Sequence, residues 1–425
     1  MIRRVAMISV HTCPLATLGG KETGGMNVYV RDLSRELGRR GIAADCFTRS
    51  QNPAAPRICR EIGPNARVMH VPAGAEAPYD KNQVVDHLPQ FVEGVLGFAR
   101  REGLTYDVIH SHYWLSGLAA RQLRQAWGAP IVQMFHTLGQ MKNAVASGPQ
   151  EWETERRIQA EAEVMSFADC LVAATPLERA QMVWLYGADA RKIVAVPCGV
   201  DLNLFQPVPQ DEARQMLGLP AGRRVILFVG RIEPLKGIDT LLRAMALLAS
   251  DGVSRQEDLS VIIVGGAPGA GAAQVRSELE RLQQLQTELG IEHLVTFMGA
   301  QNQDTLVYYY SAADVTVVPS HYESFGMVAL EAMACGTPVI ASQVGGLTFT
   351  VQDGQTGFWV PDRDPEVLAA KIRSLLDDDD LRHRLGGQAA QWAGWFGWPA
   401  VADQILGVYD QVQSAVKQLA QVSHG

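Results

Sequence analysis

Short apolar runs alternate with amphipathic helical patterns along almost the whole chain. Helical periodicity is clear in Met26–Arg40 and in Asp239–Ser250, each of which follows an apolar run. Strands that alternate with helices are typical of a parallel sheet covered by helices on both faces, so the pattern predicts an α/β fold. The runs that we expect to form strands are Arg4–Val10, Ala44–Thr48, Val108–Ser111, Ile131–His136, Cys170–Ala174, Arg224–Gly230, Leu259–Gly265, Val295–Met298, Val315–Pro319 and Pro338–Ala341.

The alternation restarts near the middle of the chain, which predicts two domains. A boundary fits the segment Gln206–Pro209, because its two prolines cannot continue a helix or a central strand. We therefore expect a first Rossmann-like domain at residues 1–205 and a second at residues 206–394, facing each other across a cleft. Residues 395–425 have a helical pattern, and we expect this segment to pack back on the first domain.

Composition narrows the class of protein. Hydrophobic residues make up 47% of the 425 residues and the net charge is only −8, which excludes a disordered chain. No block of Lys or Arg stands out, so nucleic acid is not an expected partner and a membrane surface has little support. The apolar core of Met1–Val10 is too short for a signal peptide, and we read it as the first strand. The six cysteines form no C-x-x-C pair, which favours reduced thiols and a cytoplasmic protein.

The glycine-rich segments were tested against known phosphate-binding motifs. Gly265–Gly271 follows a predicted strand, but its spacing fails the G-x-G-x-x-G pattern of dinucleotide sites, and the chain has no Walker sequence. The segment Gly19–Asn27 follows the first strand and opens a helix, so its backbone N–H groups could approach a negatively charged ligand. An ordinary βα loop explains this second segment equally well.

A sharper combination of motifs lies in the second half. The strand Arg224–Gly230 leads directly into Arg231 and Lys236, two cations that could converge on a diphosphate beyond the carboxyl end of the sheet. Further on, Glu323 precedes a predicted helix and Glu331 lies within that helix, two turns later, with seven residues between them. Each charge alone would usually be a surface residue, but the combined pattern is specific.

With these residues the chain resembles the retaining, nucleotide-sugar glycosyltransferases of the GT-B fold, family 4. The G-R-x-x-x-x-K-G segment at Gly230–Gly237 and the E-x7-E pattern at Glu323 and Glu331 match the family signature. The resemblance covers essentially the full length. It implies a donor site mostly in the second domain, an acceptor site in the first, and no metal or other cofactor besides the nucleotide-sugar co-substrate.

Two branches of that family are the most similar. The segments Gly24–Val30, Ser111–Gly117 and His136–Leu138 resemble the inositol-phosphate N-acetylglucosaminyltransferases of mycothiol biosynthesis. His136–Gly139 followed by Lys142 is also similar to sucrose-phosphate synthases. Both use phosphorylated acceptors, so the resemblance implies transfer of a hexosyl group from UDP-glucose or UDP-N-acetylglucosamine to fructose 6-phosphate or an inositol phosphate. The acceptor-binding residues that it implies are Asn27, Lys81, Tyr113, Thr137 and Arg157.

The resemblance also assigns roles on the donor side. Arg231 and Lys236 would neutralise the departing diphosphate, while Glu331 would bind the ribose hydroxyls and Glu323 the transferred sugar. In the mechanism usually proposed for this fold, the acceptor attacks on the side of the leaving group and a diphosphate oxygen takes its proton, so no protein base is assigned. The donor-binding residues implied are Gly24, Gly25, Gly230, Arg231, Lys236, Glu323, Ser324, Phe325, Gly326 and Glu331, and the catalytic ones are His136, Arg231, Lys236 and Glu323.

Several features have competing interpretations. His136 follows an apolar run and would touch the donor sugar or place the acceptor, although a lone histidine at a strand end is more often structural. His110 and His112 share one face of a strand but lack a third metal ligand. The prolines beside Asp362 and Asp364 favour a turn and a helix cap over a metal-binding D-x-D motif.

Three questions stay open at the level of sequence. Lys81 and Arg157 could instead form separate surface ion pairs, with Tyr113 in the core. The protein could be a membrane-associated lipid glycosyltransferase of the same fold, although Val84–Arg101 has mixed charges and no lysine-rich face. It could also bind nucleotide sugars without catalysis, which the intact set of Arg231, Lys236 and the two glutamates argues against. The sequence does not fix whether the chain forms a homo-oligomer.

Overall fold

The structure of the protein is a computed structural model that describes residues 2–16, 23–146, 148–220, 222–250, 259–266 and 273–422. Residues 19–22 of the glycine-rich segment Gly19–Asn27 and residues 267–271 of Gly265–Gly271 lie outside the described residues. The chain divides into two compact units, each of which is described by itself below. The first comprises residues 1–16, 25–199 and 398–425, and the second comprises residues 17–24 and 200–397. The domain boundaries expected at 205/206 and 394/395 differ from these divisions by six and three residues.

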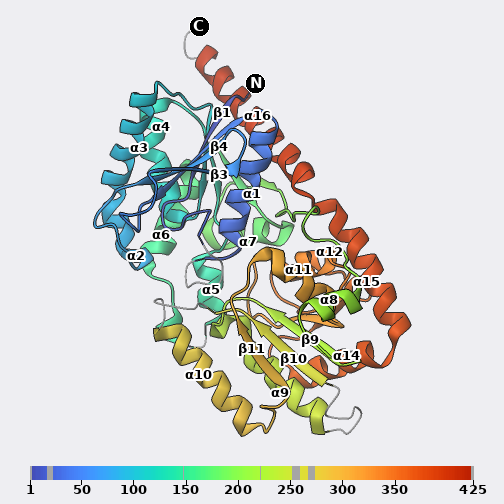
Figure 1. Ribbon diagram of the computed structural model, residues 1–425. Coiled ribbons are helices and arrows are strands. Elements are labelled where there is room, and N and C mark those ends of the chain that lie inside the picture. Colours follow the sequence, from blue (N-terminus) through green and yellow to red (C-terminus); the bar gives the residue numbers. More distant parts are fainter. Residues whose placement is uncertain are drawn as a thin grey trace. The chain divides into compact units, whose positions relative to one another are not determined.

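The first unit is built on an eight-stranded sheet in the order β3-β4-β2-β1-β5-β6-β7-β8 (Figure 1). Its strands are β1 (Arg4–Ile8), β2 (Ala43–Arg49), β3 (Ile58–Gly63), β4 (Ala66–Val71), β5 (Val108–His112), β6 (Ile131–Met134), β7 (Cys170–Ala173) and β8 (Ile193–Ala195). Its α-helices are α1 (Gly25–Arg39), α2 (Lys81–Val84), α3 (Leu88–Glu102), α4 (Trp114–Trp127), α5 (Gly139–Val145), α6 (Glu155–Phe167), α7 (Pro176–Tyr186) and α16 (Trp398–Val422). All neighbouring strands are parallel except β3 and β4.

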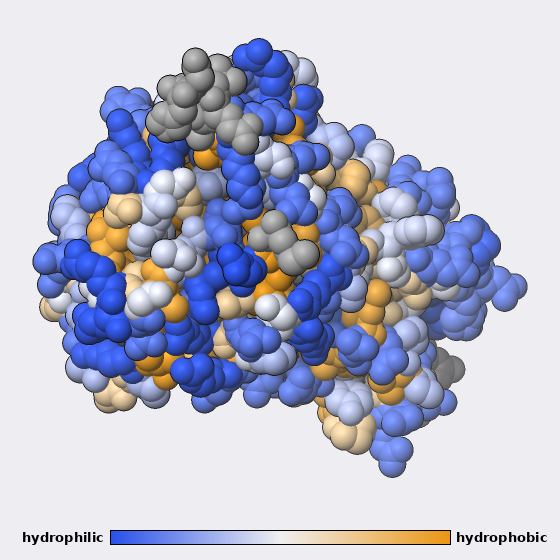
Figure 2. All heavy atoms as spheres, turned by 90° about the horizontal axis from the view of Figure 1, so that it is seen from above, coloured by the Kyte–Doolittle hydropathy of each residue, from blue (hydrophilic) through white to orange (hydrophobic). Residues whose placement is uncertain are grey.

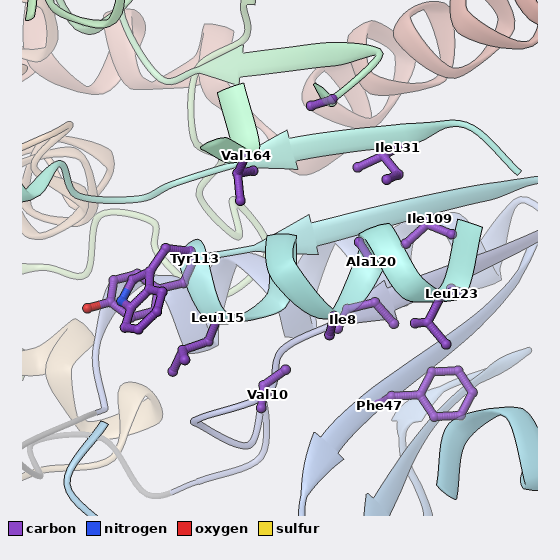
Figure 3. Close-up of a cluster of buried hydrophobic side chains, with 14 of the residues drawn as sticks. Ile8, Val10, Phe47, Ile109, Tyr113, Leu115, Ala120, Leu123, Ile131 and Val164 are labelled. Atoms are coloured by element: carbon purple, nitrogen blue, oxygen red, sulfur yellow. The ribbon is translucent and has the colours of Figure 1, made fainter. Parts of the chain in front are cut away.

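One face of this sheet packs against α3, α4 and α6. The side chains of Leu115 and Leu123 on α4 lie over Ile8 of β1 and Ile109 of β5 (Figure 3). All four are fully buried, and each contributes about 1.5–3 kcal/mol relative to an exposed position. The central strand β1 is buried along almost its whole length, which is why it reads as an unbroken apolar run rather than an alternating one.

The C-terminal helix α16 belongs to the first unit. Its Trp398 ring packs on Tyr29 of α1, with ring centroids 5.4 Å apart. The hydroxyl group of Tyr409 is hydrogen-bonded to Nδ1 of His110 in β5 at 2.7 Å, and Asp403 pairs with Arg40. These contacts join the end of the chain to residues more than 290 positions earlier.

The second unit carries a six-stranded, fully parallel sheet in the order β11-β10-β9-β12-β13-β14 (Figure 1). Its strands are β9 (Arg224–Val229), β10 (Leu259–Val264), β11 (Val295–Gly299), β12 (Val315–Val318), β13 (Val339–Ser342) and β14 (Gly357–Val360). Its α-helices are α8 (Gln210–Met216), α9 (Ile238–Ser250), α10 (Ala273–Glu288), α11 (Gln303–Ala312), α12 (Met327–Ala334), α13 (Leu347–Thr350), α14 (Pro365–Asp377) and α15 (Asp379–Ala393). Its core joins β9, β10 and β12 to α9 and α14.

The predicted α/β alternation is confirmed, with local differences. The sequence missed β3, β4, β8 and β14, and β3 is antiparallel with a largely exposed residue pattern that carries little hydrophobic signal. The strand predicted over Ile131–His136 ends at Met134, because His136 has a positive φ of 63° that no strand residue adopts. The strand predicted to start at Pro338 starts at Val339, since proline cannot donate to the ladder.

Hydrophilic residues cover most of the face visible in Figure 2, and hydrophobic residues lie there in small groups. Across the described residues, none of the helices combines the length and the apolar character that a membrane crossing requires.

Candidate active site

Three cations of the first unit converge on a single carboxylate oxygen. The Oε1 atom of Glu153 lies 2.9 Å from Nζ of Lys81, 2.5 Å from Nζ of Lys142 and 2.8 Å from Nη1 of Arg157. We call these four residues the cation cluster. The alternative, in which Lys81 and Arg157 form separate surface ion pairs, is therefore excluded, because the fold brings both cations to the same atom.

Arg157 is the buried centre of the cation cluster, with a side chain only 1% exposed. Its Nε donates to Oε1 of Glu161 at 2.7 Å, and its Nη2 donates to the backbone oxygen of Thr137 at 2.9 Å and to its Oγ1 at 3.1 Å. The guanidinium carbon lies 4.8 Å from the ring centroid of Tyr113, a cation–π distance. Lys81, Tyr113, Thr137 and Arg157 are thus brought together, as the family resemblance implied.

The parallel sheet explains this convergence. Tyr113 follows β5 directly, and Thr137 lies between β6 and α5, so both emerge at carboxyl ends of neighbouring strands. Arg157 stands in the first turn of α6, whose N-terminus is capped by the Thr154 side chain. Lys81 begins α2, which Asp80 caps. The residues gathered at this edge come from segments far apart in the sequence.

The pKa values of the residues in the cation cluster depend on one another. Burial raises the pKa of Glu153, but Arg157, Lys81 and Lys142 outweigh it and hold that pKa well below its usual range. Burial and the neighbouring Lys81 lower the pKa of Lys142. Burial alone would lower the pKa of Arg157. The neighbouring Tyr113, Glu161 and Glu153 outweigh burial and raise that pKa above its usual value, so the guanidinium is charged. Glu153 therefore offsets part of the positive charge of this site.

The partly buried His136 adjoins two fully buried imidazoles, those of His112 and His110. Its Nε2 lies 3.0 Å from Nδ1 of His112, and the ring of His112 lies tilted against that of His110, with centroids 4.3 Å apart. Tyr29 packs edge-on against His136 at 5.2 Å. Burial lowers the pKa of His136 and of His110 to about 3, so both are neutral at pH 7. A neutral His136 can accept or donate a hydrogen bond toward a ligand without adding charge.

Asn27 has a clear local role. Its amide donates to Oγ1 of Thr12 and to the backbone oxygen of Cys13, both at 2.7 Å, which fixes the segment after β1 against α1. Gly25 is the first residue of α1, and Gly24 precedes it. Beside this segment, His11 packs on the Tyr113 ring at 4.4 Å between centroids.

In the second unit, the donor residues that the resemblance implied follow the ends of β9 and β12. Arg231 is paired with Glu233 at 2.9 Å and keeps 35% of its side chain exposed. Lys236 forms an ion pair with Glu323, to which Ser320 also donates at 3.4 Å. The two motifs lie far apart in the sequence and meet through this pair. The structure thus places Lys236 and Glu323 together.

Glycines allow these loops to approach one another. A Cβ on Gly265 would lie 1.7 Å from the backbone oxygen of Gly230, and one on Gly237 would lie 2.0 Å from that of Pro319. Gly326 has a φ of 88° and is the N-cap of α12. The first N–H groups of α12 have no acceptor within the helix and point out of its N-terminus. Phe325 before it is buried against Phe349. Gly265 and Gly237 therefore allow the backbone of neighbouring loops to pack closely.

Glu331 lies in α12 and is largely buried. Its Oε2 accepts a hydrogen bond from the Tyr310 hydroxyl at 2.8 Å, and its Oε1 accepts one from Gln303 at 3.3 Å. The carboxylate is thus held in one orientation by α11.

Local contacts favour a helix cap over a metal-binding role for Asp362 and Asp364. Asp364 caps α14 by accepting from the Val367 N–H at 2.9 Å, as predicted, and Asp362 accepts from His321 at 2.7 Å. Within the part of the chain that the structure describes, no three His, Cys, Asp or Glu side chains form a group that could hold a metal ion.

Sequence reasoning missed several residues of these sites. The sequence analysis gave Glu153 and Lys142 no role. The charged residues that surround Arg157 in the sequence could have indicated that Glu153 belongs to the site. Gly345 and Gly346 lie beneath the Glu323–Gly326 segment, and the Gly346 N–H donates to the backbone oxygen of Glu323 at 2.8 Å. Their contact could not be read from a local pattern.

Each of the two units matches a model of a known protein family. Residues 209–392 match the family model "Glycosyl transferases group 1", and residues 24–199 match "Glycosyl transferase 4-like domain". A D-inositol 3-phosphate glycosyltransferase from Thermomonospora curvata is 43% identical over 99% of this chain and 98% of its own. The chain belongs to the group 1 glycosyltransferase family.

Other relatives agree with this assignment. The D-inositol 3-phosphate glycosyltransferase of Acidothermus cellulolyticus is 45% identical over 96% of this chain and 90% of its own. Among solved structures, sucrose-phosphate synthase from Thermosynechococcus elongatus has a TM-score of 0.88 and 37% identity, covering 97% of this glycosyltransferase and all of the synthase. Anabaena HepE, solved with UDP and glucose, has a TM-score of 0.74 at 20% identity and shares the fold. The fold is GT-B.

Proposed function

We propose that this glycosyltransferase moves a hexosyl group, with retention of configuration and without a metal ion, from a nucleotide sugar to a small phosphorylated polyol or sugar. The observation that carries the proposal is the cation cluster, in which Lys81, Lys142 and Arg157 meet one oxygen at 2.5–2.9 Å. A phosphate oxygen requires the same convergence of donors.

The relatives support a phosphorylated acceptor. The curated proteins at 41–45% identity are named D-inositol 3-phosphate glycosyltransferases, and the solved protein at 37% identity is a sucrose-phosphate synthase. The acceptor is therefore an inositol phosphate or fructose 6-phosphate. Thr137 supplies a hydroxyl beside Arg157, and Tyr113 presents its ring to the guanidinium.

On the donor side, bond breaking leaves negative charge on the diphosphate and an oxocarbenium-like sugar. Arg231 and Lys236 would neutralise the diphosphate, which is why no metal ion is needed. Glu323 would face the sugar, and Glu331, oriented by Tyr310, would accept hydrogen bonds from the ribose hydroxyls. Uridine is the base that we expect.

His136 would place the acceptor or contact the transferred sugar as a neutral hydrogen-bonding group. Because the acceptor attacks on the leaving-group side, a diphosphate oxygen takes its proton, and His136 need not act as a base. Its low pKa, which burial causes, agrees with a role that needs no protonation near neutral pH.

The test is nucleoside diphosphate release with UDP-glucose, UDP-N-acetylglucosamine and GDP-mannose, each paired with fructose 6-phosphate, inositol phosphates and their unphosphorylated forms. We expect turnover with one UDP-sugar and a phosphorylated acceptor, undiminished by a chelator, and an α-linked product by NMR. Equal efficiency with the unphosphorylated acceptor would overturn the proposal.

A further inference from the structure

Glu153 occupies a position that an anionic ligand would need. Its Oε1 is the meeting point of Lys81, Lys142 and Arg157, and its side chain is 6% exposed. We propose that the Glu153 carboxylate is a built-in substitute for the acceptor phosphate: it holds Lys81, Lys142 and Arg157 together without a ligand, and it is displaced when a phosphate dianion binds. This inference rests on the proposed function.

The hydrogen bonds of Arg157 show why displacement is needed. Its Nε is taken by Glu161 and its Nη2 by Thr137, so Nη1, which faces Glu153, is the edge left for a ligand. The side chains of Lys81 and Lys142 are 20% and 26% exposed, whereas that of Arg157 is 1% exposed. A phosphate can therefore approach the two lysines from solvent but reaches Arg157 only when Glu153 withdraws.

Of the two carboxylates on Arg157, only Glu153 is placed to move. Glu161 lies inside α6, is fully buried, and also accepts from the Gly139 N–H and from Tyr186. Glu153 lies before the cap of α6, in the stretch after the 3₁₀ turn Pro149–Glu151. Its backbone is held through Asn143, whose Oδ1 accepts from the Glu153 N–H at 2.7 Å, so the side chain can rotate while the loop stays in place.

The charges favour an exchange over joint occupancy. Three cations face the carboxylates of Glu153 and Glu161, which leaves one excess positive charge. A phosphate dianion in place of Glu153 would balance the three cations, whereas a dianion added beside Glu153 would leave excess negative charge in a buried site. Glu153 thereby keeps the cations charged and in position without a ligand, and it makes the site select a dianion over a singly charged anion.

Inorganic phosphate is the probe for this exchange, measured by isothermal titration calorimetry on the full chain. Glu153→Gln removes the competing charge, and we expect it to bind phosphate at least about tenfold more tightly than the unmodified protein. Glu153→Asp keeps the charge but shortens the side chain, so a smaller gain is expected. The matched control is Glu155→Gln, an exposed carboxylate two residues later at the start of α6, which accepts a hydrogen bond from Gln159.

The outcomes separate the two proposals. Phosphate binding that is unchanged or weaker in both Glu153 variants, while the unmodified protein still uses phosphorylated acceptors, overturns the exchange and leaves the proposed function standing. If no variant binds phosphate and the unmodified protein does not prefer phosphorylated acceptors, both fail. A folded Glu153→Asp variant keeps the test decisive if Glu153→Gln does not fold.

Discussion

Tyr113 and His136 adopt backbone conformations that non-glycine residues rarely take, with φ angles of 75° and 63°. Each follows a strand that runs through the buried sheet, and each turns its side chain toward the groups around Arg157 or His112. Such strain costs about 1–3 kcal/mol per residue and persists where surrounding structure enforces it. The location of the strain at the two strand ends agrees with a site there.

Lys142 offers the cleanest single-residue test of the acceptor site, because its side chain is partly exposed and it is not required by the core. We expect Lys142→Met to lower kcat/KM for a phosphorylated acceptor about 10- to 100-fold, since a charge-assisted contact to phosphate is lost. Slow donor hydrolysis without acceptor should be unaffected. Steady-state kinetics measure both, with the exposed Lys417→Met on α16 as the control.

A loss of activity that is equal with and without acceptor would place Lys142 outside the acceptor site. The same variant should show the same secondary structure by circular dichroism as the unmodified protein.

Arg231 and Lys236 are the residues that we propose neutralise the departing diphosphate. Loss of a preorganised donor to a developing charge typically costs roughly 100- to 1000-fold in rate. We expect that loss in kcat for Arg231→Ala and for Lys236→Ala. Arg231 keeps 35% of its side chain exposed, so its replacement should leave the unfolding temperature nearly unchanged.

The control for these two variants is Arg243→Ala, an exposed arginine on α9 of the same unit. Near-normal turnover of folded Arg231→Ala and Lys236→Ala enzymes would sink the donor assignment.

At the scale of elements, the loop before α13 supports the loop before α12. A Cβ on Gly346 would lie 2.1 Å from the backbone oxygen of Ser324 and 2.5 Å from its carbonyl carbon. Backbone cannot yield as a flexible side chain can, so a larger residue must push the Glu323–Gly326 segment. The shape of the Glu323–Gly326 segment thus depends on Gly346, which lies twenty residues beyond its end.

We expect Gly346→Ala to raise KM for the nucleotide sugar about tenfold or more, because a displacement of about 1 Å at a binding loop is enough to cost such factors. Donor titration by calorimetry measures the effect directly. Gly387→Ala on α15 is the control, since a Cβ there meets nothing within 4 Å and should stabilise its helix by up to about 1 kcal/mol. Unchanged donor affinity in Gly346→Ala would show that the loop is not part of the site.

The helix α16 shows how an element is assigned by contacts rather than by position. It ends the chain, yet its Tyr409 reaches His110 in the middle of the first sheet. A helix with one apolar face must bury it somewhere, and the pattern alone does not say where.

At the scale of the whole molecule, buried neutral histidines tie stability to pH. Burial, with contributions from Lys81 and Arg157, lowers the pKa of His11 to about 3, burial lowers those of His110 and His136 equally, and burial with His110 places that of His112 well below 6.5. In the unfolded chain these groups titrate near pH 6.5. The unfolded state therefore binds more protons below that pH, and stability falls as the pH drops from about 6.5 toward 3.

Between pH 7 and pH 5.5 each such histidine should remove about 1 kcal/mol from the free energy of unfolding. Glu178 offsets the contribution of about one histidine, about 1 kcal/mol. Burial raises the pKa of its carboxyl to about 7, so the folded state takes up a proton in this range that the unfolded state does not. We expect a net loss of about 3 kcal/mol in urea denaturation. A free energy that is flat over this range would contradict the neutral histidine chain, and His112→Asn should reduce the slope.

The sequence by itself determined the α/β class, the two-part organisation and the identity of the motif residues. Hydrophobic periodicity and the placement of Gly and Pro are local properties, and they report directly on burial and backbone conformation. The motifs at Arg231, Lys236 and Glu323 could be recognised because their residue types and spacing match a family signature.

Only the tertiary structure decided which charges meet. Lys81, Lys142, Glu153 and Arg157 come from different loops and helices, and nothing in their spacing sets the distances of 2.5–2.9 Å at one oxygen. The same holds for Lys236 and Glu323, for Gly346 beneath Ser324, and for α16 on the first sheet. Parallel strands bring distant segments to one edge, and long-range packing, which no local pattern encodes, sets where each side chain ends.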